Sequence, residues 1–149
     1  MGSEHLPLRN KGIYHNLPSF LPDIKDLTAI VTGANGISGF ATMRVLLENP
    51  ERWSKVWAVS RRPPPKEMMA LLTPDERIRI EHVAVDFLMD AEDIAKQLRV
   101  ANVQADYVSF YSYAQPRPNP GQPPWSNAQE LADTNGTGHR KYACRVQVH

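Results

Sequence analysis

Three glycines, Gly33, Gly36 and Gly39, are spaced at equal intervals in the stretch VTGANGISG. They follow a short apolar run, LTAIVTG, and precede a segment whose apolar residues recur at helical spacing. In this context the first glycine permits a tight turn, the second lets backbone amides approach a pyrophosphate, and the third lets a helix pack closely on a strand. The pattern therefore favours a dinucleotide-binding turn over its alternative, a glycine-rich structural loop. No Gly-Lys-Ser or Gly-Lys-Thr follows, which excludes the phosphate loop of nucleotide hydrolases.

The residues about 20 positions beyond the last glycine indicate which dinucleotide is bound, because a site for NAD carries an acid there for the ribose 2′-hydroxyl. This chain has Ser60, Arg61 and Arg62 instead. Two guanidinium groups can pair with a 2′-phosphate, so the sequence favours NADP(H). The alternative is two solvated arginines at a strand end. Asp86 can hydrogen-bond the adenine amine, and an ordinary loop-start aspartate or helix cap explains it equally well.

The elements that must position these residues alternate along the chain. Strands rich in apolar residues are predicted at 27–33, 54–60, 78–86 and 105–114. Helices are predicted from Ile37 to before Pro50 and at 66–72, 90–101 and 125–137. This alternation predicts an α/β fold, the N-terminal part of a Rossmann fold, with a parallel sheet in the order 3-2-1-4 and helices on both faces. The fourth strand would expose a sheet edge, so we expect self-association through it.

Composition narrows the classes of function and location. The 149 residues carry a net charge of +1, which gives no field that favours nucleic acid or a membrane surface. No signal pattern and no apolar run of membrane-spanning length is present, and Cys144 is the single cysteine, so we expect a cytoplasmic protein without disulfides. The five histidines have no ligand spacing, so no metal site is expected.

The chain resembles the extended and atypical short-chain dehydrogenase/reductase superfamily. Within it, the nearest likeness is to the progesterone 5β-reductase/iridoid synthase-like group, particularly its fungal members. The likeness extends over about residues 12–137 and rests on KGIYHNLPSF, VTGANGISG, NPERWSKVWAVSRRPP, VAVDFL, VSFYSYAQ and ADTNGT. It implies an NADP(H)-dependent reductase acting on an enone, an enal or a related carbonyl of a small molecule, in fungal secondary metabolism.

The resemblance also assigns roles to residues. It implies that the three glycines hold the pyrophosphate, that the two arginines hold the 2′-phosphate and that residues 112–114 line the nicotinamide side. The predicted cofactor-binding residues are Thr32, Gly33, Asn35, Gly36, Ile37, Gly39, Ser60, Arg61, Arg62, Asp86, Phe87, Ser112 and Ala114.

The catalytic tyrosine and lysine of the superfamily have no counterpart in this sequence. No lysine follows a tyrosine by four positions, and the family pattern is lost after Thr137. We interpret Tyr107, Tyr111 and Tyr113 as strand packing and predict no catalytic residue in the chain. The predicted organisation is a lead-in at 1–26, a partial dinucleotide-binding domain at 27–137 and a tail at 138–149. A truncated family member is therefore expected, and the alternatives to an active reductase are a catalytically silent nucleotide-binding module and a non-functional fragment.

Overall fold

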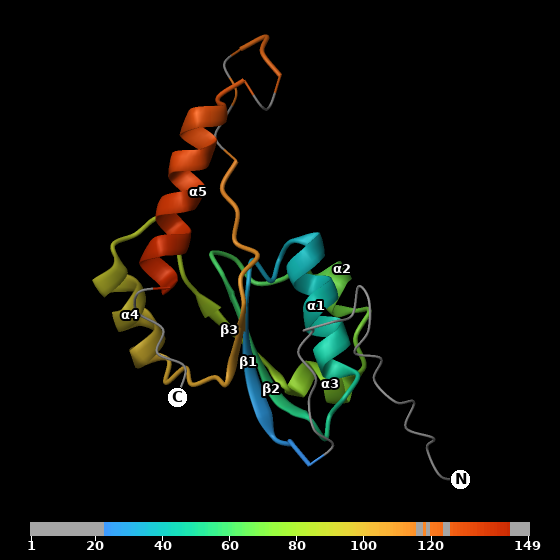
Figure 1. Ribbon diagram of the computed structural model, residues 1–149. Helices are drawn as coiled ribbons and strands as arrows, with labels where there is room; N and C mark the ends of the chain where they lie inside the picture. Colours follow the sequence, from blue (N-terminus) through green and yellow to red (C-terminus); the bar gives the residue numbers. More distant parts are fainter. Residues whose placement is uncertain (1–22, 116–117, 119, 124–125, 144–149) are drawn as a thin grey trace, which may run out of the picture.

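A four-stranded parallel sheet is the centre of the molecule in the computed structural model (Figure 1). The structure describes residues 23–115, 118, 120–123 and 126–143, with side chains as far as residue 136. The sheet has the order β3-β2-β1-β4, which confirms the predicted order and the parallel α/β class. Most of the predicted lead-in, the end of the tail with Cys144, and part of the proline-rich loop lie outside the described residues.

Strands and helices alternate along the chain, except that two short helices separate β2 from β3. In order, the elements are β1 (Leu27–Thr32), α1 (Ile37–Leu47), β2 (Trp53–Ser60), α2 (Lys66–Met69), α3 (Pro74–Ile78), β3 (Ile80–Ala84), α4 (Ala91–Val100), β4 (Tyr107–Ser109) and α5 (Ala128–Ala143).

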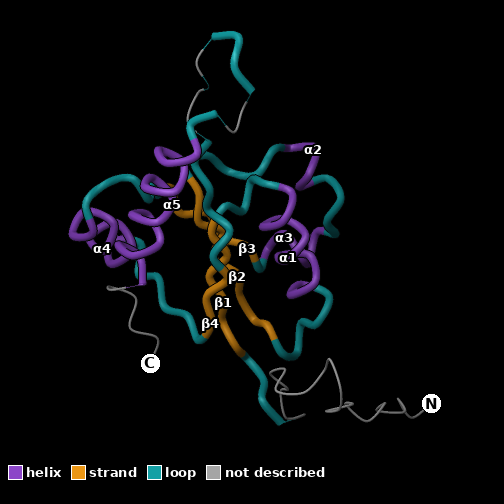
Figure 2. Tube along the Cα trace, turned by 45° about the horizontal axis from the view of Figure 1, so that its top comes forward, coloured by secondary structure: helices purple, strands orange, loops and turns teal. Residues whose placement is uncertain are grey.

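Helices cover both faces of the sheet, and each face has its own apolar core. The helices α1, α2 and α3 lie on one side, and α4 and α5 lie on the other (Figures 1 and 2). Phe40, Met43 and Leu47 of α1 pack with alternate residues of the two central strands on the first side. Ile94 and Leu98 of α4 pack with the intervening strand residues on the second side. Because both faces are buried there, the central strands are apolar over residues 29–31 of β1 and 56–59 of β2, as their sequences predicted.

The strand β4 is much shorter than the predicted strand at 105–114. Its pairing with β1 ends at Val31 and Ser109, because β1 itself ends one residue later, where the backbone of Gly33 turns with φ 62°. Beyond Ser109 this segment is not part of a strand. The N–H group of Tyr111 donates instead to the hydroxyl oxygen of Thr32, at 2.8 Å. The predicted extension beyond Ser109 was therefore wrong.

This shortening also changes the interpretation of the three tyrosines. The rings of Tyr107 and Trp53 pack edge to face, at 5.6 Å between centroids, as strand packing predicts. Tyr111 and Tyr113 lie beyond β4 and are 43% and 61% exposed. Strand packing was the wrong interpretation for these two. In the described residues β4 is an edge strand, and self-association through it stays a prediction.

Two helices also differ from the predicted ones. The helix α3 was not predicted, although Thr73 and Glu76 form a capping box around Pro74 at its start. The helix predicted at 125–137 begins at Ala128 and continues to Ala143, through Gly136 and Gly138. In the part of the chain that the structure describes, no helix combines the length and the apolar content needed to cross a membrane.

Candidate functional site

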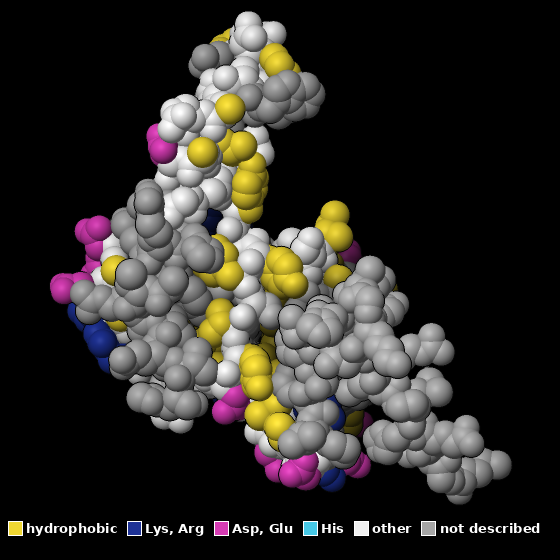
Figure 3. Space-filling model, viewed as in Figure 1, with side chains coloured by type: hydrophobic (Ala, Val, Ile, Leu, Met, Phe, Trp, Pro, Cys, Tyr) yellow, Lys and Arg dark blue, Asp and Glu magenta, His cyan; other side chains and the backbone are white. Residues whose placement is uncertain are grey.

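Segments that follow all four strands meet in one pocket at the carboxyl edge of the sheet. The surface is hollowed there, between α5 and the α1 side of the molecule (Figure 3). The pocket is lined by Gly33 and Asn35 after β1, Ser60 and Arg61 at the end of β2, residues 85–88 after β3, Phe110 and residues 112–114 after β4, and Thr134 and Asn135 of α5. In a parallel α/β sheet this edge is where ligands bind.

The turn after β1 is built around the close approach of two glycines. The N–H of Gly33 donates to the carbonyl oxygen of Val59 at 2.9 Å, and the carbonyl oxygen of Gly33 accepts the N–H of Gly36, also at 2.9 Å. A Cβ atom on Gly39 would lie 2.3 Å from the Gly33 carbonyl oxygen. Only a residue without a side chain therefore fits at Gly39, and the helix packs closely on the turn that precedes it.

The N-terminus of α1 is open to a ligand. Gly36 is its N-cap residue, no side chain caps the helix, and no acidic residue lies in its first turn. The first-turn amides therefore have no side-chain acceptor, and the helix dipole adds positive potential at this end. Such an end binds phosphate well. Ile37, the first residue of α1, is 85% exposed and, like Gly36 and Gly39, is not among the residues that line the pocket.

Thr32 is fully buried, and its side chain holds the segment after β4 in place. Its hydroxyl oxygen accepts the N–H groups of Tyr111 and Ser112, at 2.8 and 3.1 Å. These bonds attach the segment after β4 to the end of β1, so that Ser112 lies beside Gly33 in the pocket wall. Thr32 thus positions the wall and does not itself line the pocket.

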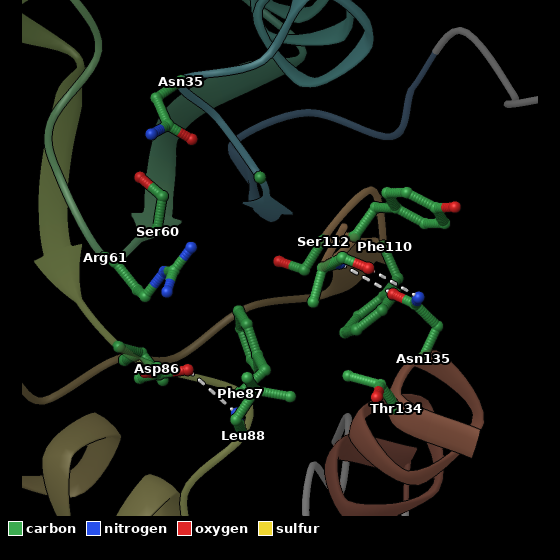
Figure 4. A pocket seen from close by; sticks show the side chains of 14 residues that line it. Asn35, Ser60, Arg61, Asp86, Phe87, Leu88, Phe110, Ser112, Thr134 and Asn135 are labelled. Atoms are coloured by element: carbon green, nitrogen blue, oxygen red, sulfur yellow. Dashed lines mark hydrogen bonds between the residues drawn. The ribbon is translucent and has the colours of Figure 1, made fainter. Parts of the chain in front are cut away.

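The end of β2 places one arginine at the pocket. The side chain of Arg61 extends between Ser60 and Asp86 (Figure 4), and both arginines are exposed. Arg62 does not line the pocket, and its carbonyl accepts the hydroxyl of the buried Ser60 at 2.7 Å. The structure therefore brings Arg61, but not Arg62, to the other predicted residues.

The segment after β3 supplies a carboxylate and an apolar wall. One oxygen of Asp86 accepts the N–H of Leu88 at 3.0 Å, so the side chain folds over its own turn. Phe87 is buried, and its ring meets Phe110 edge to face at 5.4 Å between centroids. This pair closes one side of the pocket with aromatic surface, against which a flat heterocycle can pack.

Asn135 is a pocket residue to which the sequence assigned no role. Its amide nitrogen donates to the carbonyl oxygens of Ala114 and Leu131, both at 2.9 Å, and its amide oxygen accepts the N–H of Ala114 at 2.8 Å (Figure 4). These bonds attach α5 to the segment after β4. An asparagine within a helix was the available signal, because asparagine favours caps and turns over helix interiors.

Catalytic groups are sparse in the described pocket. Tyr113 is part of the lining, but no lysine is among the described lining residues. No group of three or more histidine, cysteine or acidic side chains that could hold a metal occurs among the described residues. The arrangement offers amides, a guanidinium group and a carboxylate, which are groups that bind and orient a ligand.

Solved structures share this architecture. An NADPH-bound carbonyl reductase from chicken fatty liver matches with a TM-score of 0.58 at 16% identity, over 81% of this chain and 50% of that one. A short-chain dehydrogenase/reductase from Saccharomyces cerevisiae matches with a TM-score of 0.53 at 17% identity, over 79% and 46%. A carbonyl reductase from Pseudomonas aeruginosa matches with a TM-score of 0.54 at 18% identity, over 81% and 57%.

These likenesses establish the Rossmann-type α/β fold of the chain, which spans about half the length of the structures it matches. A scan against protein-family models and a search of curated proteins gave no match. The roles of the individual site residues stay predictions.

Proposed function

We propose that this chain binds NADP(H) and supplies the cofactor-binding part of a short-chain reductase that acts on a carbonyl, enone or enal of a small molecule. The observation that carries this proposal is the uncapped N-terminus of α1 beside a pocket that also contains Arg61 and Asp86. Helix amides suit a pyrophosphate, a guanidinium group suits a 2′-phosphate, and a carboxylate accepts the adenine amine. The family group suggested by the sequence, with fungal secondary metabolism, is part of this proposal.

The glycine turn fits a dinucleotide. Gly39 accepts no Cβ atom, and a Cβ atom on Gly36 would lie 3.3 Å from the Gly33 carbonyl oxygen, so the turn keeps its backbone uncovered where a pyrophosphate approaches. When bound, a nicotinamide cofactor supplies hydride. The residues of this chain would bind and orient it: the first-turn amides at the pyrophosphate, Arg61 at the 2′-phosphate, and the Phe87 and Phe110 wall beside a ring.

A catalytically silent nucleotide-binding module is the second candidate function. It is favoured by the composition of the described pocket lining, in which no lysine accompanies Tyr113. A reductase of this kind uses a tyrosine with a lysine to stabilise charge that develops on the substrate oxygen. Both candidate functions require the cofactor site, and they differ in whether bound NADPH is oxidised by an enone or a carbonyl compound.

Isothermal titration with NADPH and with NADH tests the proposal. The decisive variant is Arg61→Ala with Arg62→Ala, and its matched control is Lys96→Ala with Arg99→Ala, which removes the same charge from exposed positions on α4. We expect the first variant to lose about 10- to 100-fold in NADPH affinity, the equivalent of one charge-assisted hydrogen bond, and the control to retain it.

Failure to bind either cofactor by a folded chain would overturn the proposal. Equal affinity for NADPH and NADH would overturn its NADP(H) part. Oxidation of NADPH by an enone or a carbonyl compound would distinguish the reductase from the silent module.

A further inference from the structure

We propose that His82 is a positioning residue for the recognition of the 2′-phosphate, which selects NADPH over NADH; this inference rests on the proposed function. His82 lies on β3, where its backbone pairs with Ala58 of β2, two residues before Ser60. Its ring is half-buried on the same side of the sheet as Ser60, and it does not line the pocket. Any effect on the cofactor must therefore pass through another residue.

A chain of hydrogen bonds leads from His82 to the arginines. The Nε2 atom of His82 lies 3.1 Å from the carbonyl oxygen of Ser60, which has only lone pairs to offer, so the ring nitrogen is the donor. The same carbonyl also accepts the backbone N–H of Val85, at the longer distance of 3.3 Å. The hydroxyl of Ser60 then donates to the carbonyl oxygen of Arg62 at 2.7 Å. The same ring nitrogen lies 3.5 Å from that hydroxyl. Ser60 is 4% exposed, so water has little access to replace these partners.

The two anchored carbonyls enclose the segment that carries both guanidinium groups. The Ser60 carbonyl belongs to the peptide unit before Arg61, and the Arg62 carbonyl belongs to the peptide unit after Arg62. The next residues are Pro63, Pro64 and Pro65, whose rings fix the backbone angle φ. The backbone of Arg61 and Arg62 is thus held at both ends, and a phosphate that binds there need not first order this loop.

His82 is separate from the rest of the predicted cofactor site. Three glycines, Gly33, Gly36 and Gly39, maintain the predicted pyrophosphate turn. The hydrogen bond from the N–H of Gly33 to the carbonyl oxygen of Val59 also holds it. None of these contacts involves His82. Its loss should therefore weaken the binding of NADPH, which has the 2′-phosphate, and leave the binding of NADH unchanged.

The test compares His82→Gln with His82→Leu in titrations with both cofactors. A glutamine amide can still donate to the Ser60 carbonyl, whereas leucine retains apolar bulk without a donor. We expect His82→Leu to lower the ratio of NADPH to NADH affinity by about two- to tenfold, which is the loss of one hydrogen bond, and His82→Gln to keep the wild-type ratio. Ser60→Ala, which removes the next link, should change the ratio in the same direction.

The matched control is Glu81→Gln, the adjacent residue of β3, which pairs with Lys55 away from the arginines. It should leave the ratio unchanged. If His82→Leu does not fold, His82→Asn replaces it with the same expectation, because its shorter amide does not reach the Ser60 carbonyl.

An unchanged ratio in a folded His82→Leu or His82→Asn protein would overturn the inference, as would equal weakening of both cofactors, which indicates a structural role alone. These outcomes leave the proposed function intact. A wild-type chain that binds neither cofactor would instead overturn the proposed function, and this inference with it.

Discussion

The hydroxyl oxygen of Thr32 accepts the backbone N–H of Tyr111 at 2.8 Å, across 79 positions of sequence. It also accepts the N–H of Ser112, so one buried side chain holds the segment after β4 against the end of β1. The pocket depends on this attachment, since Ser112 and Ala114 line it and the backbone of Ser112 lies against Gly33. Thr32 therefore connects the packing of the sheet to the geometry of the site.

Thr32→Val should destabilise the fold and displace that wall. Valine matches threonine in shape, but it leaves the N–H groups of Tyr111 and Ser112 without their acceptor. An unsatisfied buried donor costs about 1–3 kcal/mol, so we expect a loss within that range in the free energy of unfolding. Urea denaturation measures it. Thr32→Ser keeps the hydroxyl and is the control, and equal stability of the two variants would refute the role of the hydrogen bonds.

Gly39→Ala and Gly36→Ala should have different effects. A Cβ atom at Gly39 would lie 2.3 Å from the Gly33 carbonyl oxygen, a backbone atom that cannot move aside, so we expect a stability loss beyond about 1–3 kcal/mol. At Gly36 the corresponding distance is 3.3 Å. Gly36→Ala should therefore fold and bind NADPH more weakly, because its methyl group covers the approach to the amides. Thermal denaturation and titration separate the two effects, and a Gly39→Ala protein of wild-type stability would contradict the packing argument.

Asp86→Asn should weaken cofactor binding without unfolding the chain. The asparagine oxygen can still accept the N–H of Leu88, which Asp86 accepts at 3.0 Å. The second oxygen becomes an amide nitrogen, a donor facing the donor amine of adenine. A charged hydrogen bond contributes about 1.5–3 kcal/mol, so a loss of about 10- to 150-fold in NADPH affinity is expected. If titration gives wild-type affinity, Asp86 only supports its turn, which is the alternative that the sequence left open.

The capping box of α3 should make stability depend on acidity. Hydrogen bonds from the backbone N–H of Thr73 and then from its hydroxyl hold the pKa of the Glu76 carboxyl below its ordinary value of 4.5. Because the folded pKa is lower than the unfolded one, the stabilisation is present above pH 4.5 and is lost as the pH falls through the folded pKa. Melting curves recorded at successively lower pH should show a smaller fall in melting temperature for Glu76→Gln than for the wild-type chain. The same dependence of melting temperature on pH in both proteins would rule out this contribution. Glu67→Gln on α2 is the control.

The sequence predicted the elements that depend on local pattern. Apolar runs located β1 and β2, because strands buried on both faces admit few polar residues. The glycine spacing located the turn that leads into α1. From these elements the order of the sheet followed correctly.

Contacts between distant segments could not be predicted in this way. The position at which β4 ends depends on the turn at Gly33 and on the hydroxyl of Thr32. Both residues lie outside 105–114, so the pattern of that segment could not predict where the strand ends. The role of Asn135 depends equally on where the backbone of Ala114 passes. In the arginine pair, local sequence does not reveal that Arg61 lines the pocket and Arg62 does not.

A two-dimensional NMR titration of the ¹⁵N-labelled chain with NADPH tests most directly whether a dinucleotide binds at the carboxyl edge of the sheet. We expect the amide signals of residues 33–39, 60–62, 86–88 and 112–114 to shift on binding, while those of α3 stay unchanged. Smaller shifts are expected at residues 60–62 when NADH replaces NADPH, because NADH has no 2′-phosphate. Shifts confined to other segments, or no shifts in a folded chain, would contradict a dinucleotide site at the carboxyl edge of the sheet.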